Sequence, residues 1–172
     1  MRISQINKFV ERFNSHISLD EEIVAEKQGR YFLLDGNLKG LVSRDFFCAG
    51  TYLGKGTKNK FFPSFNLLRM ISEGKANKTV VDKKTEWLFV CGRDIFKHGI
   101  VTVEGGRRKG AYTLILNQHR ECLGFGKIVC DIDRESDGRA VAVENILDVG
   151  DFLRREKLES IRFRRKRKKR CS

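Results

Sequence analysis

Residues 86–126 contain the clearest series of fold signals in this chain, and they read EWLFVCGRDIFKHGIVTVEGGRRKGAYTLILNQHRECLGFG. The apolar run that ends at Gly92 has the length of a β-strand and is too short for a stable lone helix. The next six residues predict a single helical turn. Asp94 can cap this turn, and Gly99 can take the left-handed conformation that ends it.

Further strands are predicted after that turn. Residues 100–103 and 111–116 are strand-like runs, and the loop between them contains three consecutive basic residues at 107–109. Residues 123–126 read LGFG, and alternating glycines let another backbone or a ligand come close to a strand. The segment therefore predicts a small domain of short strands.

This order of strand, short turn, strand and glycine-rich strand resembles a PUA domain, a small β-barrel module that binds RNA. Residues 88–92, 94–100 and 123–127 carry the resemblance. A second set of three runs follows in order along the chain: GTYLGK at 50–55, LGFG at 123–126 and DVGDFLR at 148–154. Together they are similar to the Nip-seven family of ribosome biogenesis factors, over roughly residues 38–156.

The resemblance implies a function and a set of site residues. The Nip-seven family has an α/β domain before a C-terminal PUA domain, and acts as a non-enzymatic assembly factor for the large ribosomal subunit and its precursor RNA. PUA domains hold RNA around the short helix and its glycines, which here correspond to Gly92, Arg93, Lys97, His98 and Gly99. Basic residues at the end of the family's PUA domain correspond to Arg154, Arg155 and Lys157.

An amphipathic helix is predicted near the start of the chain. Ile6, Phe9, Val10 and Phe13 follow the helical spacing, and Ser4 can cap the first turn. We expect this helix to pack on a sheet.

The rest of the first half predicts a hairpin, a third strand and a second helix. Residues 22–25 and 31–34 flank a turn at Gly29, and residues 41–42 favour another strand. Residues 43–48 fit either a strand or a short helix. Ser64 can cap a helix that carries the apolar residues of 65–71. The polar residues 72–78 predict a domain boundary.

Residues 50–63 are rich in glycine and lysine without forming a nucleotide-binding loop. Only three residues separate Gly50 from Gly54, and Gly56 stands where a phosphate-binding loop needs Ser or Thr. A basic hairpin loop is the better interpretation. Its lysines could touch an RNA backbone or could simply be solvated, and the sequence leaves both open.

The positive charge is concentrated at the C-terminus. The net charge is +13. Residues 1–78 hold 13 basic and 8 acidic side chains, residues 79–161 hold 14 of each, and residues 162–172 hold 8 basic side chains and none that is acidic. Such a tail cannot pack in a core, so we expect it to be disordered when free and to contact RNA. A localisation signal and a contact with a membrane surface are the alternatives that its composition leaves open. The predicted contacts in the tail are Arg162, Arg164, Arg165, Lys166 and Arg167.

Several other functions find no support in the sequence. No apolar run approaches the roughly 20 residues that span a bilayer. The five cysteines form no C-x-x-C pair, and the three histidines lie in separate segments without a nucleophile motif. We therefore predict no membrane contact, no metal, no cofactor, no small-molecule substrate and no enzymatic activity. A cytoplasmic location is expected, or a nucleolar one in a eukaryote.

The predicted fold class is α+β. An N-terminal α/β domain with a mostly antiparallel sheet occupies residues 1–78, a PUA-type β-barrel residues 79–160, and a basic disordered tail residues 161–172. The predicted function is RNA binding in large-subunit biogenesis, with other biogenesis proteins meeting the N-terminal domain. Two alternatives remain: a PUA protein of transfer RNA binding or translation, and an RNA-modification enzyme or its accessory subunit.

Overall fold

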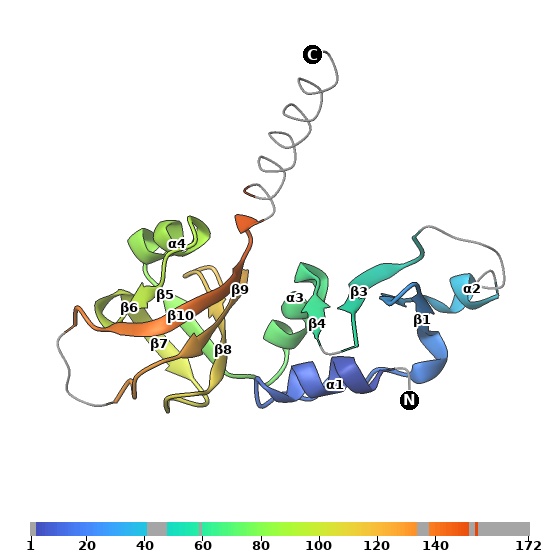
Figure 1. Ribbon diagram of the computed structural model, residues 1–172, viewed down its shortest axis with the longest axis horizontal. Coiled ribbons are helices and arrows are strands. Elements are labelled where there is room, and N and C mark those ends of the chain that lie inside the picture. The colour runs from blue at the N-terminus through green and yellow to red at the C-terminus, as the bar shows by residue number, and fades with distance from the viewer. Residues whose placement is uncertain (1–2, 41–47, 59, 134–137, 152–153, 155–172) are drawn as a thin grey trace, which may run out of the picture.

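The computed structural model describes residues 3–40, 48–58, 60–133, 138–151 and 154. Figure 1 shows two sheets at opposite ends of an elongated molecule, with the helices α1 and α3 between them. The predicted third strand at 41–42 lies outside the described residues, as does the segment 43–47.

The first half forms a four-stranded antiparallel sheet in the order β1-β2-β3-β4. Its elements are α1 (Ser4–Glu11), η1 (Glu21–Ile23), β1 (Val24–Lys27), β2 (Arg30–Leu33), α2 (Gly36–Lys39), β3 (Thr51–Gly56), β4 (Phe61–Pro63) and α3 (Phe65–Glu73).

The second half forms a curled, half-barrel sheet of six strands in the order β6-β10-β9-β8-β5-β7. Within the described strands, only the β5–β8 pair is parallel. Its elements are β5 (Lys78–Val81), α4 (Lys83–Val90), β6 (Ile95–Phe96), η2 (Lys97–Gly99), β7 (Ile100–Glu104), β8 (Tyr112–Leu116), β9 (Cys122–Ile128) and β10 (Val141–Asp148).

The helices and hairpin predicted in the first half are confirmed. All four apolar side chains predicted to share a face of α1 are buried. Ser64 caps α3, since its hydroxyl oxygen accepts a hydrogen bond from the Leu67 backbone N–H at 3.2 Å. The predicted cap of α1 is wrong: Ile3 holds the cap position with no side-chain hydrogen bond, and Ser4 is the first helical residue.

The predicted strand before Gly92 is also wrong, because these residues end the helix α4. Asp82 starts the helix: its carboxylate accepts a hydrogen bond from the Thr85 backbone N–H at 2.7 Å. The helix therefore begins among polar residues that give no strand signal, and one face of it buries Phe89. Gly92 follows the helix with φ 86°, the left-handed conformation common after a helix end.

The predicted helical turn at residues 93–98 is shorter than expected. It covers Lys97–Gly99 as a 3-10 turn, and β6 precedes it. Asp94 does not cap it, because its carboxylate accepts a hydrogen bond from the Asn145 backbone N–H at 2.9 Å. Gly99 does not adopt the predicted left-handed conformation.

The glycines of the LGFG run act as predicted, by letting a neighbouring backbone approach. Gly124 pairs with Asp148, and Gly126 with Asn145, across the antiparallel β9–β10 ladder. A side chain at either glycine would overlap a backbone carbonyl of β10. These two positions therefore set how closely β10 can lie on the half-barrel.

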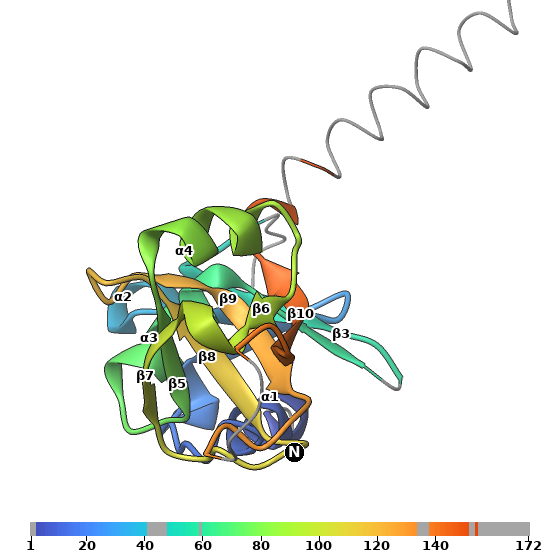
Figure 2. The same cartoon turned by 90° about the vertical axis from the view of Figure 1, so that its left-hand side faces the viewer.

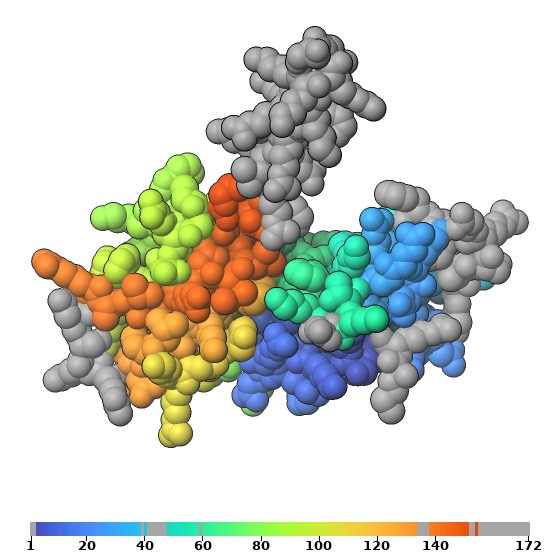
Figure 3. Space-filling view, in the orientation of Figure 1, coloured from blue at the N-terminus to red at the C-terminus, as the bar shows by residue number. Residues whose placement is uncertain are grey.

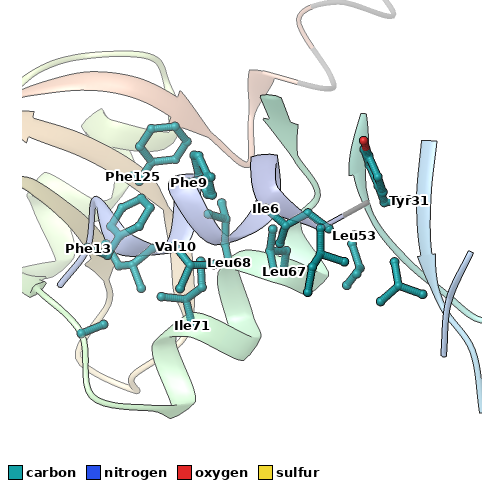
Figure 4. Packing of buried hydrophobic residues seen from close by; sticks show 14 residues of the cluster. Ile6, Phe9, Val10, Phe13, Tyr31, Leu53, Leu67, Leu68, Ile71 and Phe125 are labelled. Atoms are coloured by element: carbon teal, nitrogen blue, oxygen red, sulfur yellow. The ribbon is translucent and has the colours of Figure 1, made fainter. Parts of the chain in front are cut away.

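One hydrophobic cluster joins the two halves. Phe125 of β9 packs against Phe9 of α1 and against Phe13 in the turn after α1, with ring centroids 5.6 Å apart in both pairs and edge-to-face geometry. Figure 4 shows Phe125 above these two rings, with Leu68 and Ile71 of α3 on the other side of α1. We call Phe9, Phe13 and Phe125 the aromatic junction.

The aromatic junction leads to a prediction about stability. Phe125→Ala is expected to lower the free energy of unfolding by about 3–5 kcal/mol, because it removes a buried ring that both halves contact. Urea unfolding, followed by far-UV circular dichroism and by the fluorescence of the single tryptophan, measures the loss. Both probes should shift together, since one core serves both halves.

The matched control for this variant is Phe62→Ala, because the Phe62 side chain is 50% exposed. It is expected to change the free energy of unfolding by about 0.5 kcal/mol or less. A shift of only one of the two probes in Phe125→Ala would contradict a shared core.

Candidate nucleic-acid interface

Helix α4 presents a cationic and aromatic face to solvent. Phe89 and Thr85 are buried against the half-barrel, so the opposite side of the helix is exposed. That side carries Lys83, Lys84 and Trp87, whose side chain is 69% exposed. Figure 2 shows α4 at the top of the domain, above β6 and β10. An exposed indole beside two ammonium groups suits a ligand with both negative charge and flat rings.

Two more exposed aromatic side chains, Phe96 and His98, lie where β6 runs directly into η2. The rings of Phe96 and His98 are nearly parallel, at 18°, with centroids 5.9 Å apart. Phe96 is 39% exposed. The segment after β9 holds this part of the chain in place, since the His98 backbone N–H donates to the Gly138 carbonyl at 3.2 Å and the Lys97 N–H to that of Ala140 at 3.0 Å.

Asn145 of β10 ties the turn after α4 to the sheet. Its side-chain amide donates to the carbonyl of Phe89 at 3.0 Å and to that of Arg93 at 3.4 Å. The same amide lies 3.2 Å from the Asp148 carboxylate. The exposed Arg93 side chain therefore projects from a turn whose backbone is held at several points.

Arg154 clamps the C-terminal end of α4 onto β10. Its guanidinium donates to the Val90 carbonyl at 2.7 Å and to the Asp148 carboxylate at 2.6 Å. The Asp148 side chain is 3% exposed, and this hydrogen bond raises the pKa of Arg154. A free carbonyl at the end of a helix attracts a cation. Asp148 is the last residue of β10, so its bond to Arg154 joins the helix end to that strand.

Glycines leave room for this clamp. A Cβ at Gly92 would lie 3.3 Å from the Arg154 guanidinium carbon, and one at Gly150 would overlap the Val90 carbonyl. The clamp borders a shallow polar hollow of about 290 Å³, lined by Cys91, Gly92, Asn145, Ile146, Leu147, Asp148, Asp151 and Arg154.

The residues predicted from the sequence divide into three groups. Arg93, Lys97 and His98 lie in the segment that links α4 to β7, and Arg93 and His98 are exposed. The Arg154 side chain is 40% exposed, and its guanidinium binds the Val90 carbonyl and the Asp148 carboxylate of the same chain. The other predicted contacts lie outside the described residues, namely Arg155, Lys157, Arg162, Arg164, Arg165, Lys166 and Arg167. RNA contact stays a prediction for all of them.

Lys83, Lys84 and Trp87 were missed because the apolar run containing Trp87 was interpreted as a strand. Asp82 is the signal that could have found them. An Asp followed three residues later by Thr85 and then by Glu86 fits a helix start, and a helix would have placed both lysines on the Trp87 side.

Comparison with known families identifies the second half. Residues 77–157 match the family model described as UPF0113 PUA domain. This segment is a PUA domain. A search of curated proteins found no match.

Two solved structures share the fold over most of the chain. One is a conserved PUA domain protein from Thermoplasma acidophilum, with TM-score 0.56 and 22% identity, covering 88% of this chain and 91% of that one. The other is a PUA domain from Aeropyrum pernix K1 in a tartrate complex, with TM-score 0.54 and 17% identity, covering 85% and 82%. At these identities the similarity concerns the fold alone.

The described part of the chain holds neither a membrane-spanning helix nor a cluster of metal ligands. No helix there is long and apolar enough to cross a membrane. Across the same residues, no group of three His, Cys, Asp or Glu side chains is placed to hold a metal ion.

The Arg154 clamp gives a stability prediction. Arg154→Ala is expected to lower the free energy of unfolding by about 1–3 kcal/mol, because it leaves the buried Asp148 carboxylate without its charged donor. Thermal and urea unfolding measure the change. Asp148→Asn with Arg154→Ala completes a double-mutant cycle, in which a coupling of at least about 0.5 kcal/mol is expected. Additive effects would show that the two groups do not depend on each other.

Proposed function

We propose that this protein binds RNA through the exposed side of α4 and through the segment that links α4 to β7 in its PUA domain. We call this surface the α4 face, and it comprises Lys83, Lys84, Trp87, Arg93, Phe96 and His98. The observation that supports it best is the Trp87 side chain, 69% exposed beside two lysines of the same helix. The PUA domain itself supports RNA as the partner.

The chemistry of the α4 face fits unpaired RNA. Lysine and arginine bind phosphates by charge and counterion release, without reading the sequence. Exposed aromatic rings add stacking with bases that are free of a duplex. Asn145 and Arg154 bind backbone carbonyls at the end of α4, so the backbone that carries these cations and rings is held in place before RNA arrives.

We further propose that the RNA belongs to the large ribosomal subunit or its precursor, and that the protein acts as a non-enzymatic assembly factor. The resemblance to the Nip-seven family in residues 50–55, 123–126 and 148–154 supports this role. Other biogenesis proteins would meet the N-terminal half, and the site of action would be the cytoplasm, or the nucleolus in a eukaryote. Sequencing of RNA crosslinked to the protein in its source cell tests this assignment.

Trp87→Ala is expected to weaken binding of single-stranded RNA by about 5- to 100-fold, because stacking contributes about 1–3 kcal/mol per base. Fluorescence anisotropy with labelled oligouridylate measures the affinity. Trp87→Phe keeps an aromatic ring and should retain most of it.

The control for Trp87→Ala is Val101→Ala on β7, another exposed apolar side chain of the PUA domain. It should bind as the unaltered chain does. Equal affinities of Trp87→Ala and the unaltered chain would remove Trp87 from the proposed surface.

The basic tail leads to a separate prediction about salt dependence. Ending the chain at residue 161 removes 8 basic side chains. If the tail contacts phosphates, the slope of log affinity against log salt should flatten by about 0.7 for each phosphate that the shortened chain no longer binds. Anisotropy titrations at increasing salt measure that slope. An unchanged slope would show that the tail does not touch this RNA.

A further inference from the structure

The β1–β4 sheet carries a row of basic side chains across three strands. Lys27 pairs with Arg30, Arg30 with Lys55, and Lys55 with Phe62. Directly paired residues of neighbouring strands point to the same face of a sheet. These four side chains, which we call the sheet row, therefore lie abreast on one face.

That face is the one turned away from α1. Tyr31 and Phe61, the neighbours of Arg30 and Phe62 along their strands, pack in the core that contains α1. Because side chains alternate along a strand, the sheet row points in the opposite direction. Lys55 is exposed, and Phe62 is 50% exposed.

The charge that the strands place on this face is positive. A polyanion laid across three cations abreast would meet complementary charge on all three strands. Glu26 is the only acidic residue in the four strands, and it pairs with Tyr31 on the other face. Burial raises the pKa of Tyr31, and the negative charge of Glu26 adds to the rise, which agrees with this placement.

On one side of the sheet row this face is covered, because Phe32 is buried there with Ala25 and Leu34, whereas exposed basic groups continue the surface on the other side. Tyr52 lies in the next cross-strand pair on the same face, opposite Phe32. Burial raises its pKa while the Arg30 charge opposes the rise, so Arg30 lies near the phenol. In the β3–β4 loop, Lys58 and Lys60 are exposed, and Thr57 bonds to the backbone of Lys60 at 3.0 and 3.1 Å.

We propose that the sheet row is a second RNA-binding surface, at which lysine and arginine contact phosphates of a single strand and Phe62 stacks on a base. Basic and aromatic groups on the exposed end of a sheet suit a single strand better than a duplex, whose bases are stacked on each other. This inference rests on the proposed RNA-binding function, which supplies the choice of RNA among polyanions.

The two surfaces belong to different halves of the molecule. In Figure 1, α4 and the β3–β4 hairpin lie on opposite sides of the junction between the halves. Figure 3 shows their surfaces separated by that of β10. A strand long enough to reach both surfaces binds more tightly than a short one, because the second contact becomes intramolecular.

The test uses the full chain and two labelled oligouridylates. The short one has about 8 nucleotides, within the range of one single-strand site. The long one has about 30 nucleotides, roughly twice the upper end of that range. Phe62→Ala is expected to weaken binding of the long oligomer by about 5- to 100-fold, whereas Phe62→Tyr, which keeps a ring, should bind normally. Lys55→Ala should flatten the salt slope for the long oligomer by about 0.7.

Lys8→Ala is the matched control for Lys55→Ala. It removes the same charge from an exposed position on α1, on the other side of the sheet. Its salt slope should equal that of the unaltered chain. An equal flattening of the slope in both variants would overturn the proposal, because general charge would then explain the effect.

The outcomes separate this inference from the function on which it rests. Normal binding by Phe62→Ala and Lys55→Ala, with weak binding by Trp87→Ala, would overturn the sheet row and leave the α4 face intact. The reverse pattern would support the sheet row and overturn the α4 face. No binding of either oligomer by the unaltered chain would overturn both.

Discussion

The contact of Phe125 with Phe9 and Phe13 is the interaction on which the rest of the structure depends. Phe125 lies in β9, the strand that pairs with both β8 and β10, while the other two rings belong to the first helix of the chain and to the turn after it. Each half is small, and a small domain buries too little surface to be very stable alone. Sharing a core lets α1 and α3 serve both sheets, and fixes how the exposed face of one half lies relative to the other.

The surfaces proposed to bind RNA lie away from this core. In each of them, different interactions hold the backbone in place. On the α4 face, the helix end is held from outside the helix, by Asn145 and by Arg154 paired with the buried Asp148. In the β1–β4 sheet, the strand register itself aligns the side chains. In both cases the backbone that carries the functional side chains is fixed before a ligand arrives, which lowers the entropy lost on binding.

The parts of the fold that could be predicted from the sequence are those with a strong local pattern. The spacing of Ile6, Phe9, Val10 and Phe13 predicts α1, and Ser64 before an apolar run predicts α3. Helix α4 was missed because its four C-terminal residues are as apolar as a buried strand. Its start depends on one hydrogen bond, from the Thr85 N–H to Asp82, that an apolar pattern does not contain.

The site was less predictable than the fold, because its geometry depends on residues far apart in sequence. The resemblance to PUA domains indicated Arg93, Lys97 and His98, which all lie in the segment that links α4 to β7. It could not indicate that Arg154 binds Val90, 64 residues away. Likewise, Lys27, Arg30 and Lys55 form a row only once the strand register is known, since a shift of one residue would turn a strand's side chains to the other face.

Ultraviolet crosslinking in the source cell, followed by sequencing of the RNA attached to this protein, is the most direct test of whether it binds ribosomal RNA. We expect RNA to be recovered well above an unirradiated control, with large-subunit ribosomal RNA or its precursor enriched. Recovery of transfer RNA or small-subunit RNA would contradict the assembly role while keeping RNA as the partner. Recovery of no RNA above the control would contradict the account as a whole.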